Sequence, residues 1–185
     1  NLFASHIDSK IVIEGNNEFA FGLYSQLKKD DDNLFFSPFS ISTALAMTYA
    51  GASGNTAKQM ADVLHFNLEE EKLHQTFAQL MQDLNSASNK SGYQLNITNA
   101  LWGQSSYKFY DEFLTIAKNY YDAGFKEVDF INDKNREVAR KTINNWVESK
   151  TNDKIKEMIK PGILKAITRI VLTNAIYFKG KWQFQ

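Results

Sequence analysis

The stretch from Ile167 to Phe178 constrains the fold of this 185-residue chain more than any other part of it. Most of its residues are apolar and many are β-branched, a composition typical of a strand that is covered on both faces. An exposed edge on such a strand would be a site of aggregation. We therefore expect the stretch to be paired on both sides, with one partner strand supplied by polypeptide outside these 185 residues.

Helical periodicity occupies much of the rest of the chain. Ser37-Pro38 begins the best-marked helix, because serine caps a first turn and proline fits its first position. Residues 39–50 of this helix are apolar nearly all round, which indicates burial. Further helices are predicted over residues 16–27 with Asn16 or Asn17 as cap, 55–64 with Asn55 as cap, 69–84, 109–121 and 134–150.

The alternation of apolar and polar residues from Tyr93 to Leu101 predicts a period-two strand. Short apolar runs predict two more strands, at 34–36 and 125–130, while 85–92 and 151–165 are expected to be a polar loop and an irregular basic connection. The chain has no internal repeat and no linker. The sequence therefore predicts one continuous α+β domain over residues 1–185.

Charge and composition limit the partners that the chain can have. Apolar residues make up 43% of it, so it is globular, and 21 basic residues balance 21 acidic ones. This balance produces no long-range field for nucleic acid or anionic lipid, and we expect neither partner. No apolar run is long enough to span a bilayer, and no signal peptide is recognised, although processing before Asn1 could have removed one.

No catalytic or metal-binding pattern is present in the sequence. Cysteine is absent, which excludes disulfides and thiolate chemistry, and three scattered histidines (His6, His65 and His74) do not form a metal site. The run from Gly51 to Gly54 lacks the G-x-S-x-G spacing, and Glu69–Glu71 diverge around a helix. We expect no enzyme activity and no cofactor. Two glycosylation sequons, at Asn89 and Asn96, are attributed to chance.

Motifs in several places, taken together, resemble the serpin family. Residues 33–42 (Asn-Leu-Phe-Phe-Ser-Pro-Phe-Ser-Ile-Ser) resemble the serpin signature N-x-F-x-S-P-x-S-I, and residues 171–182 (Val-Leu-Thr-Asn-Ala-Ile-Tyr-Phe-Lys-Gly-Lys-Trp) resemble a second one. Pieces at 99–101, 143–147 and 151–155 also fit, in family order. The resemblance implies the N-terminal portion of a serpin fold, with helices packed on a large central mixed sheet. The reactive-centre loop and the remaining strands would lie beyond Gln185.

The resemblance implies a suicide inhibitor of serine proteases, with cysteine proteases as alternative targets. In this family the protease cleaves the reactive loop and is trapped as an acyl-enzyme, and the loop then enters the main sheet as an extra strand. Residues 168–178 would form one lip of the opening, and helix 134–150 would lie across the sheet and have to yield. The partners implied are a protease, met through the absent loop, and the C-terminal remainder of the protein.

The resemblance also assigns roles to individual residues. Ser37, Ser40 and Asn174 would form a polar latch beneath the opening, often called the shutter, while Thr173, Lys179 and Trp182 belong to the region where the sheet opens. Simpler alternatives remain: Ser37 as a helix cap, Ser40 bonding back to its own helix, and Trp182 as core. Asn174 is harder to explain otherwise, because an amide inside an apolar strand needs hydrogen-bond partners.

A non-inhibitory serpin (a carrier, chaperone or storage protein) is the first alternative, and a hydrolase is the second. Heparin activation is not expected, because helix 69–84 carries Lys72 as its single cation beside Glu69, Glu70, Glu71 and Asp83. The expected location is extracellular, with the cytoplasm as the alternative.

Overall fold

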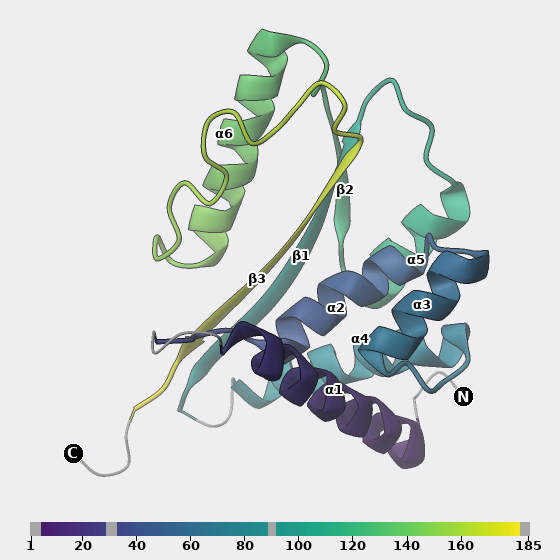
Figure 1. Cartoon of the computed structure of the whole chain (residues 1–185). Coiled ribbons are helices and arrows are strands. Elements are labelled where there is room, and N and C mark those ends of the chain that lie inside the picture. Colours follow the sequence, from purple (N-terminus) through teal and green to yellow (C-terminus); the bar gives the residue numbers. More distant parts are fainter. Residues whose placement is uncertain (1–4, 29–32, 89–91, 182–185) are drawn as a thin grey trace. The chain divides into compact units, whose positions relative to one another are not determined.

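The computed structural model describes residues 5–28, 33–88 and 92–181 (Figure 1). Helices and strands follow one another in these residues, as the predicted α+β class requires. The elements are α1 (His6–Leu27), α2 (Pro38–Tyr49), α3 (Gly54–Leu64), α4 (Glu70–Ser88), β1 (Gln94–Gln104), α5 (Asp111–Tyr121), β2 (Gly124–Val128), α6 (Asp133–Lys150) and β3 (Ile170–Lys179). The chain forms two compact units, divided between Asp83 and Leu84, which are described separately below.

Helix α1 begins ten residues earlier than predicted. Ser5 is its N-cap, where the Ser5 hydroxyl accepts from the Asp8 N–H at 3.1 Å and the Asp8 carboxylate accepts from the Ser5 N–H at 3.2 Å. This reciprocal pair satisfies two N–H groups of the first turn. Asn16 and Asn17 therefore lie inside the helix, and the prediction that either caps it was wrong.

Helix α2 begins as predicted, at Pro38. The hydroxyl of its N-cap Ser37 accepts from the Ser40 N–H at 3.3 Å, and Ala46 and Met47 are fully buried. The strand predicted just before this helix, at 34–36, is wrong. No other strand pairs with that segment in the described part of the chain, and an apolar run without a ladder partner does not form a strand.

Helices α3 and α4 form, but their ends differ from the prediction. Ser53, not Asn55, stands at the N-cap of α3. Helix α4 continues to Ser88, past the loop predicted from residue 85, and buries an apolar stripe with Leu73, Phe77 and Met81. Burial lowers the pKa of His74 on α4 to about 4, so this histidine is neutral at neutral pH.

A close approach between α1 and the end of α3 yields a stability prediction. A Cβ built on Gly15 would lie 2.4 Å from the His65 carbonyl oxygen, whereas one on Gly22, in the same helix, would meet nothing within 4 Å. Gly15→Ala should therefore destabilise the full-length protein by about 1–3 kcal/mol. Gly22→Ala is the matched control and should stabilise it by up to about 1 kcal/mol through helix propensity. Denaturant melts of both variants measure this, and equal effects would contradict the packing argument.

The second unit is built on a mixed sheet of strand order β2-β1-β3 in the described residues. Strand β1 is central, parallel to β2 and antiparallel to β3, with Asn99 opposite Asn174 and Trp102 opposite Val171. Strand β3 lies at the edge of this sheet, and Ile167, which we expected to belong to the apolar strand, precedes it and is 78% exposed. A second partner for β3 remains a prediction.

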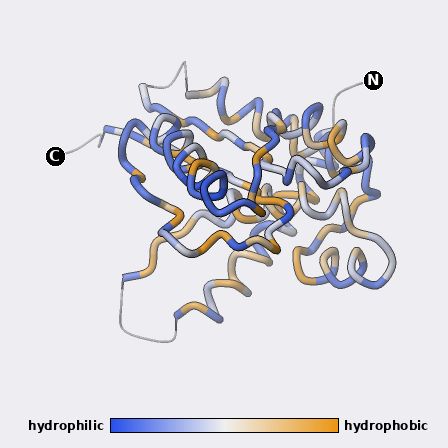
Figure 2. The backbone as a smooth tube through the Cα atoms, turned by 90° about the horizontal axis from the view of Figure 1, so that it is seen from above, coloured by the Kyte–Doolittle hydropathy of each residue, from blue (hydrophilic) through white to orange (hydrophobic). Residues whose placement is uncertain are grey.

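Helix α6 lies across one face of the sheet and contacts all three strands (Figure 1). The buried core beneath it joins the strand residues Ala100 and Trp102, the helix residues Ala139 and Ile143, and three others: Phe130, Ile159 and Leu164. Figure 2 shows hydrophobic and hydrophilic residues alternating at short intervals along the helices, as expected for helices with one buried face. The prediction that helix 134–150 would lie across the sheet is confirmed.

Candidate functional site

A pair of amides joins β1 to β3 inside the sheet. Asn174 Nδ2 donates to Asn99 Oδ1 at 2.8 Å, and Asn99 Nδ2 donates to the Tyr121 carbonyl oxygen at the end of α5 at 2.9 Å. Asn99 is only 5% exposed. The register of the two strands places the amides opposite each other, between the apolar pairs formed by residues 97 and 176 and residues 101 and 172. Asn174 is half-buried, so the pair lies partly within the sheet, and it holds the two strands together only while both amides keep their hydrogen bonds.

A second polar contact joins the same strands on the face that α6 covers. Trp102 Nε1 donates to Thr173 Oγ1 at 3.0 Å, and Thr173 Oγ1 donates to the Ala100 carbonyl oxygen at 3.2 Å. Trp102 is fully buried. The Trp146 ring of α6 packs edge-on against it, with 6.1 Å between the two ring centroids, and Lys126 Nζ lies 4.8 Å from the centroid of the Trp102 ring. Strands β1 and β3 are therefore bonded through side chains on both faces of the sheet.

The remaining residues predicted for the site are distributed over both units. Ser37 and Ser40 stand at the start of α2, where they form the capping bond described above, and their predicted contact with Asn174 remains a prediction. Lys179 is the exposed last residue of β3. Trp182 lies outside the described residues.

Sequence reasoning missed Asn99. This residue occupies an inward position in the alternating pattern of residues 93–101, where an apolar side chain was expected. The signal was therefore the same as for Asn174: an amide at an apolar position. Gln104, at the end of β1, was missed as well, although it is 3% exposed and bonded to several groups.

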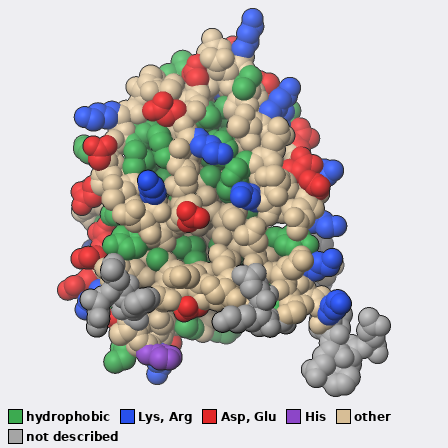
Figure 3. All heavy atoms as spheres, turned by 180° about the vertical axis from the view of Figure 1, so that it is seen from behind, with side chains coloured by type: hydrophobic (Ala, Val, Ile, Leu, Met, Phe, Trp, Pro, Cys, Tyr) green, Lys and Arg blue, Asp and Glu red, His purple; other side chains and the backbone are tan. Residues whose placement is uncertain are grey.

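Asp129, which follows β2, keeps its charge through hydrogen bonds from neutral groups. Hydrogen bonds from the Asn135 side chain, and then from the Asn132 and Ile131 N–H groups, lower the pKa of Asp129 to about 2. Figure 3 shows acidic and basic side chains interspersed on the face that it draws. Among the described residues, no group of three acidic or histidine side chains could hold a metal ion, and none of the helices is long and apolar enough to cross a membrane.

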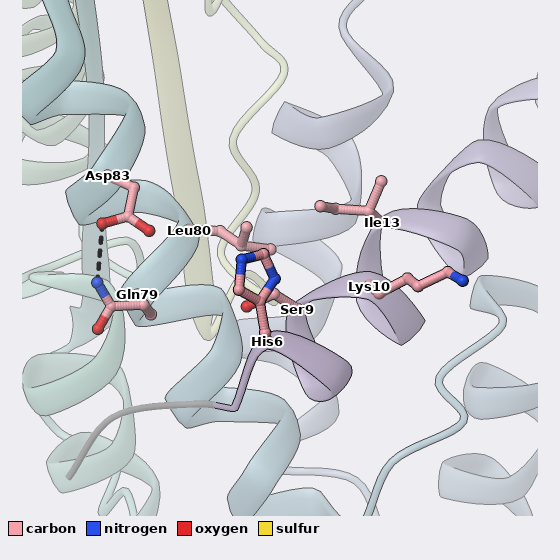
Figure 4. Close-up of a pocket in the computed structure, with 7 residues that line it drawn as sticks. All are labelled: His6, Ser9, Lys10, Ile13, Gln79, Leu80 and Asp83. Atoms are coloured by element: carbon pink, nitrogen blue, oxygen red, sulfur yellow. Dashed lines mark hydrogen bonds between the residues drawn. The ribbon is translucent and has the colours of Figure 1, made fainter.

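A groove lies between α1 and α4 in the first unit (Figure 4). Its volume is about 640 Å³, with Lys10 and His6 on the α1 side and Asp83 and Gln79 on the α4 side. Lys10 Nζ lies 3.7 Å from the Glu14 carboxylate, and Gln79 Nε2 donates to Asp83 at 2.8 Å. The polar groups of the groove therefore balance one another, and no concentration of positive charge marks it as an anion site.

The fold and the site define a class of protein in which helices pack on a mixed sheet whose strands are bonded through buried polar side chains. The family model for serpins, described as serine protease inhibitor, matches residues 14–185. The chain belongs to the serpin family.

Individual relatives and solved structures agree with this assignment. The leukocyte elastase inhibitor of Xenopus tropicalis is 45% identical over 89% of this chain and 43% of its own length. Ovalbumin from emu (Dromaius novaehollandiae) is similar in structure with a TM-score of 0.82 and 33% identity, over 93% of this chain and 47% of that one. Cleaved kallistatin complexed with heparin has a TM-score of 0.83 and 31% identity, over 95% of this chain and 51% of that one. The chain thus spans about half the length, or less, of the proteins it matches.

Proposed function

We propose that the full-length protein containing this chain inhibits a serine protease by trapping it and inserting its cleaved reactive loop into the main sheet beside β3. The similarity to a leukocyte elastase inhibitor supports a serine protease as the target, and a cysteine protease is the alternative. The observation that carries the proposal is the edge position of β3, an apolar strand bonded on one side to β1 in the described residues. Such a strand accepts an added strand through its backbone groups.

The polar latch is part of this proposal. The side chains that would keep the sheet closed until cleavage are those of Ser37, Ser40 and Asn174, to which we add Asn99. The region where insertion begins would be marked by Thr173, Lys179 and Trp182. The hydrogen bond from Asn174 to the buried Asn99 supports this role, because it holds β3, the strand beside which the loop would insert, to its neighbour β1. Helix α6 lies over the same strands and must yield when the sheet widens.

A protease panel tests the proposed function. The full-length protein is incubated with elastase-like, trypsin-like and chymotrypsin-like serine proteases and with a papain-like cysteine protease. If the protein is an inhibitor, we expect a complex with the protease that survives denaturing electrophoresis. We also expect protease activity to be lost at about one molecule of inhibitor per molecule of protease. Cleavage of the loop without any stable complex would instead identify a non-inhibitory serpin acting as a carrier, chaperone or storage protein.

Absence of enzyme activity is also proposed. No nucleophile with a neighbouring base was found in the sequence, so a serine-directed covalent probe should not label this chain. Labelling that is lost when a single serine is replaced would favour a hydrolase. The extracellular location remains a prediction.

Heparin activation through α4 is not expected, although a heparin complex exists for kallistatin. Lys72 is exposed, but Glu70, Glu71 and Asp83 on the same helix are exposed as well, so an anionic polymer would be repelled. The rate of protease inhibition should be unchanged by heparin, in the wild type and in Lys72→Ala alike. A large acceleration that disappears in Lys72→Ala would contradict this prediction.

A further inference from the structure

One residue of the sheet, Gln104, holds both ends of the segment that contains α6. Its side-chain oxygen accepts from the Phe130 N–H at 2.6 Å, and its own N–H donates to the Arg169 carbonyl oxygen at 2.8 Å. Phe130 and Arg169 flank residues 131–168, which comprise α6 and the irregular return to β3. We call residues 131–168 the α6 flap. Its entrance and its exit are thus bonded to the sheet at the same residue, at the end of β1.

The α6 flap is bonded internally by two buried side chains of the helix. Asn144 exchanges two hydrogen bonds with the backbone of Ile159, Nδ2 to the carbonyl oxygen at 2.9 Å and Oδ1 from the N–H at 2.8 Å. Arg140 Nη1 donates to the same carbonyl oxygen at 2.8 Å and lies 3.3 Å from Glu157. Both side chains are less than 10% exposed, so water does not compete for their bonds to the Ile159 backbone. Helix and return segment are therefore one bonded body.

The contact between the α6 flap and the sheet is of a different kind. In the described part of the chain, no hydrogen bond or ion pair joins residues 131–168 to β1, β2 or β3. The side chains that meet there are apolar: Ile143, Ile159 and Leu164 of the flap pack against Ala100, Trp102 and Val171 of the strands. Apolar contacts are non-directional, so they can be lost and remade without leaving a polar group unpaired.

We propose that the α6 flap leaves the sheet as one body, hinged at Gln104, when the sheet opens, and that Arg140 and Asn144 are the positioning residues that keep it intact. The alternative is that α6 melts turn by turn. The geometry points to movement as a body because the bonds within the flap are polar and buried while those to the sheet are apolar. The inference rests on the proposed function only for the purpose of the movement, which is to make way for the inserted loop. The opening of the flap itself needs no protease.

Amide hydrogen exchange on the full-length protein, without protease, tests the inference. In the wild type, the amides of α6 and the Ile159 amide should share one opening free energy and one dependence on denaturant concentration. Asn144→Ala should uncouple them, so that the return segment exchanges at least tenfold faster than the helix. Arg140→Gln should act in the same direction and serves as the second variant if Asn144→Ala does not fold.

Two further variants separate the hinge from the internal bonds. Thr142→Ala is the control, because the Thr142 hydroxyl bonds only to the Val138 carbonyl of its own helix, and it should leave the coupling unchanged. Gln104→Ala removes the bond to Phe130 and should raise the opening rate of the whole flap at least fivefold while α6 and Ile159 remain coupled. Independent exchange of helix and return segment in the wild type would overturn the inference, as would coupling that persists in both Asn144→Ala and Arg140→Gln. Failure to inhibit any protease would overturn only the proposed function.

Discussion

Asn174→Leu is expected to convert the full-length protein from an active monomer into latent or polymeric forms on mild heating. The substitution removes the donor to Asn99 Oδ1, and losing a hydrogen bond to a buried amide costs about 1–3 kcal/mol. The native state should lose more than the loop-inserted state, because an additional strand restores pairing in the sheet. Native gel electrophoresis after heating, with inhibitory activity followed in parallel, measures the change.

A double-mutant cycle provides the control for this prediction. Asn99→Leu alone should be destabilising as well, because it removes the acceptor of the Asn174 amide and the donor to the Tyr121 carbonyl oxygen. The double variant Asn99→Leu/Asn174→Leu should cost less than the sum of the two, since two apolar side chains leave no unpaired group between them. Additive effects, or an Asn174→Leu protein that stays monomeric and active like the wild type, would remove the latch role.

Expression of residues 1–185 alone is expected to give an aggregated or molten product. Strand β3 is paired only with β1 in the described residues, and large apolar side chains are exposed: Phe21 at 74%, Phe35 at 101% and Phe178 at 66%. An open strand edge is a template for association between copies, and exposed apolar side chains favour association as well. Dye binding to exposed apolar surface and the absence of a cooperative thermal transition are the expected observations.

Complementation is the matched experiment for the isolated chain. Coexpression with the C-terminal remainder of the protein should restore solubility and a cooperative melt, because we expect the remainder to supply the second partner of β3. A soluble, cooperatively melting monomer of residues 1–185 alone would show that no second partner is needed.

Local signals in the sequence were sufficient for several features of the fold. Ser37-Pro38 located the start of α2, and the alternation of residues 93–101 located β1, because caps and side-chain periods depend only on neighbouring residues. The same reasoning failed for Asn16 and Asn55, whose residue type suits a cap but whose positions lie inside helices. Ser5 with Asp8 was the stronger signal in α1, since the two bonds support each other.

The sequence by itself determined the α+β class, the family and the presence of an amide at position 174 that needed a partner. Only the tertiary structure decided which partner: Asn99 lies 75 residues away, and the antiparallel register of β1 and β3 brings the two amides together. The same is true of Gln104, whose bonds to Phe130 and Arg169 depend on where a long excursion of the chain leaves and rejoins the sheet. Hydrogen bonds between distant residues depend on strand register and on the path of the chain, and neither is encoded in the spacing of neighbouring residues.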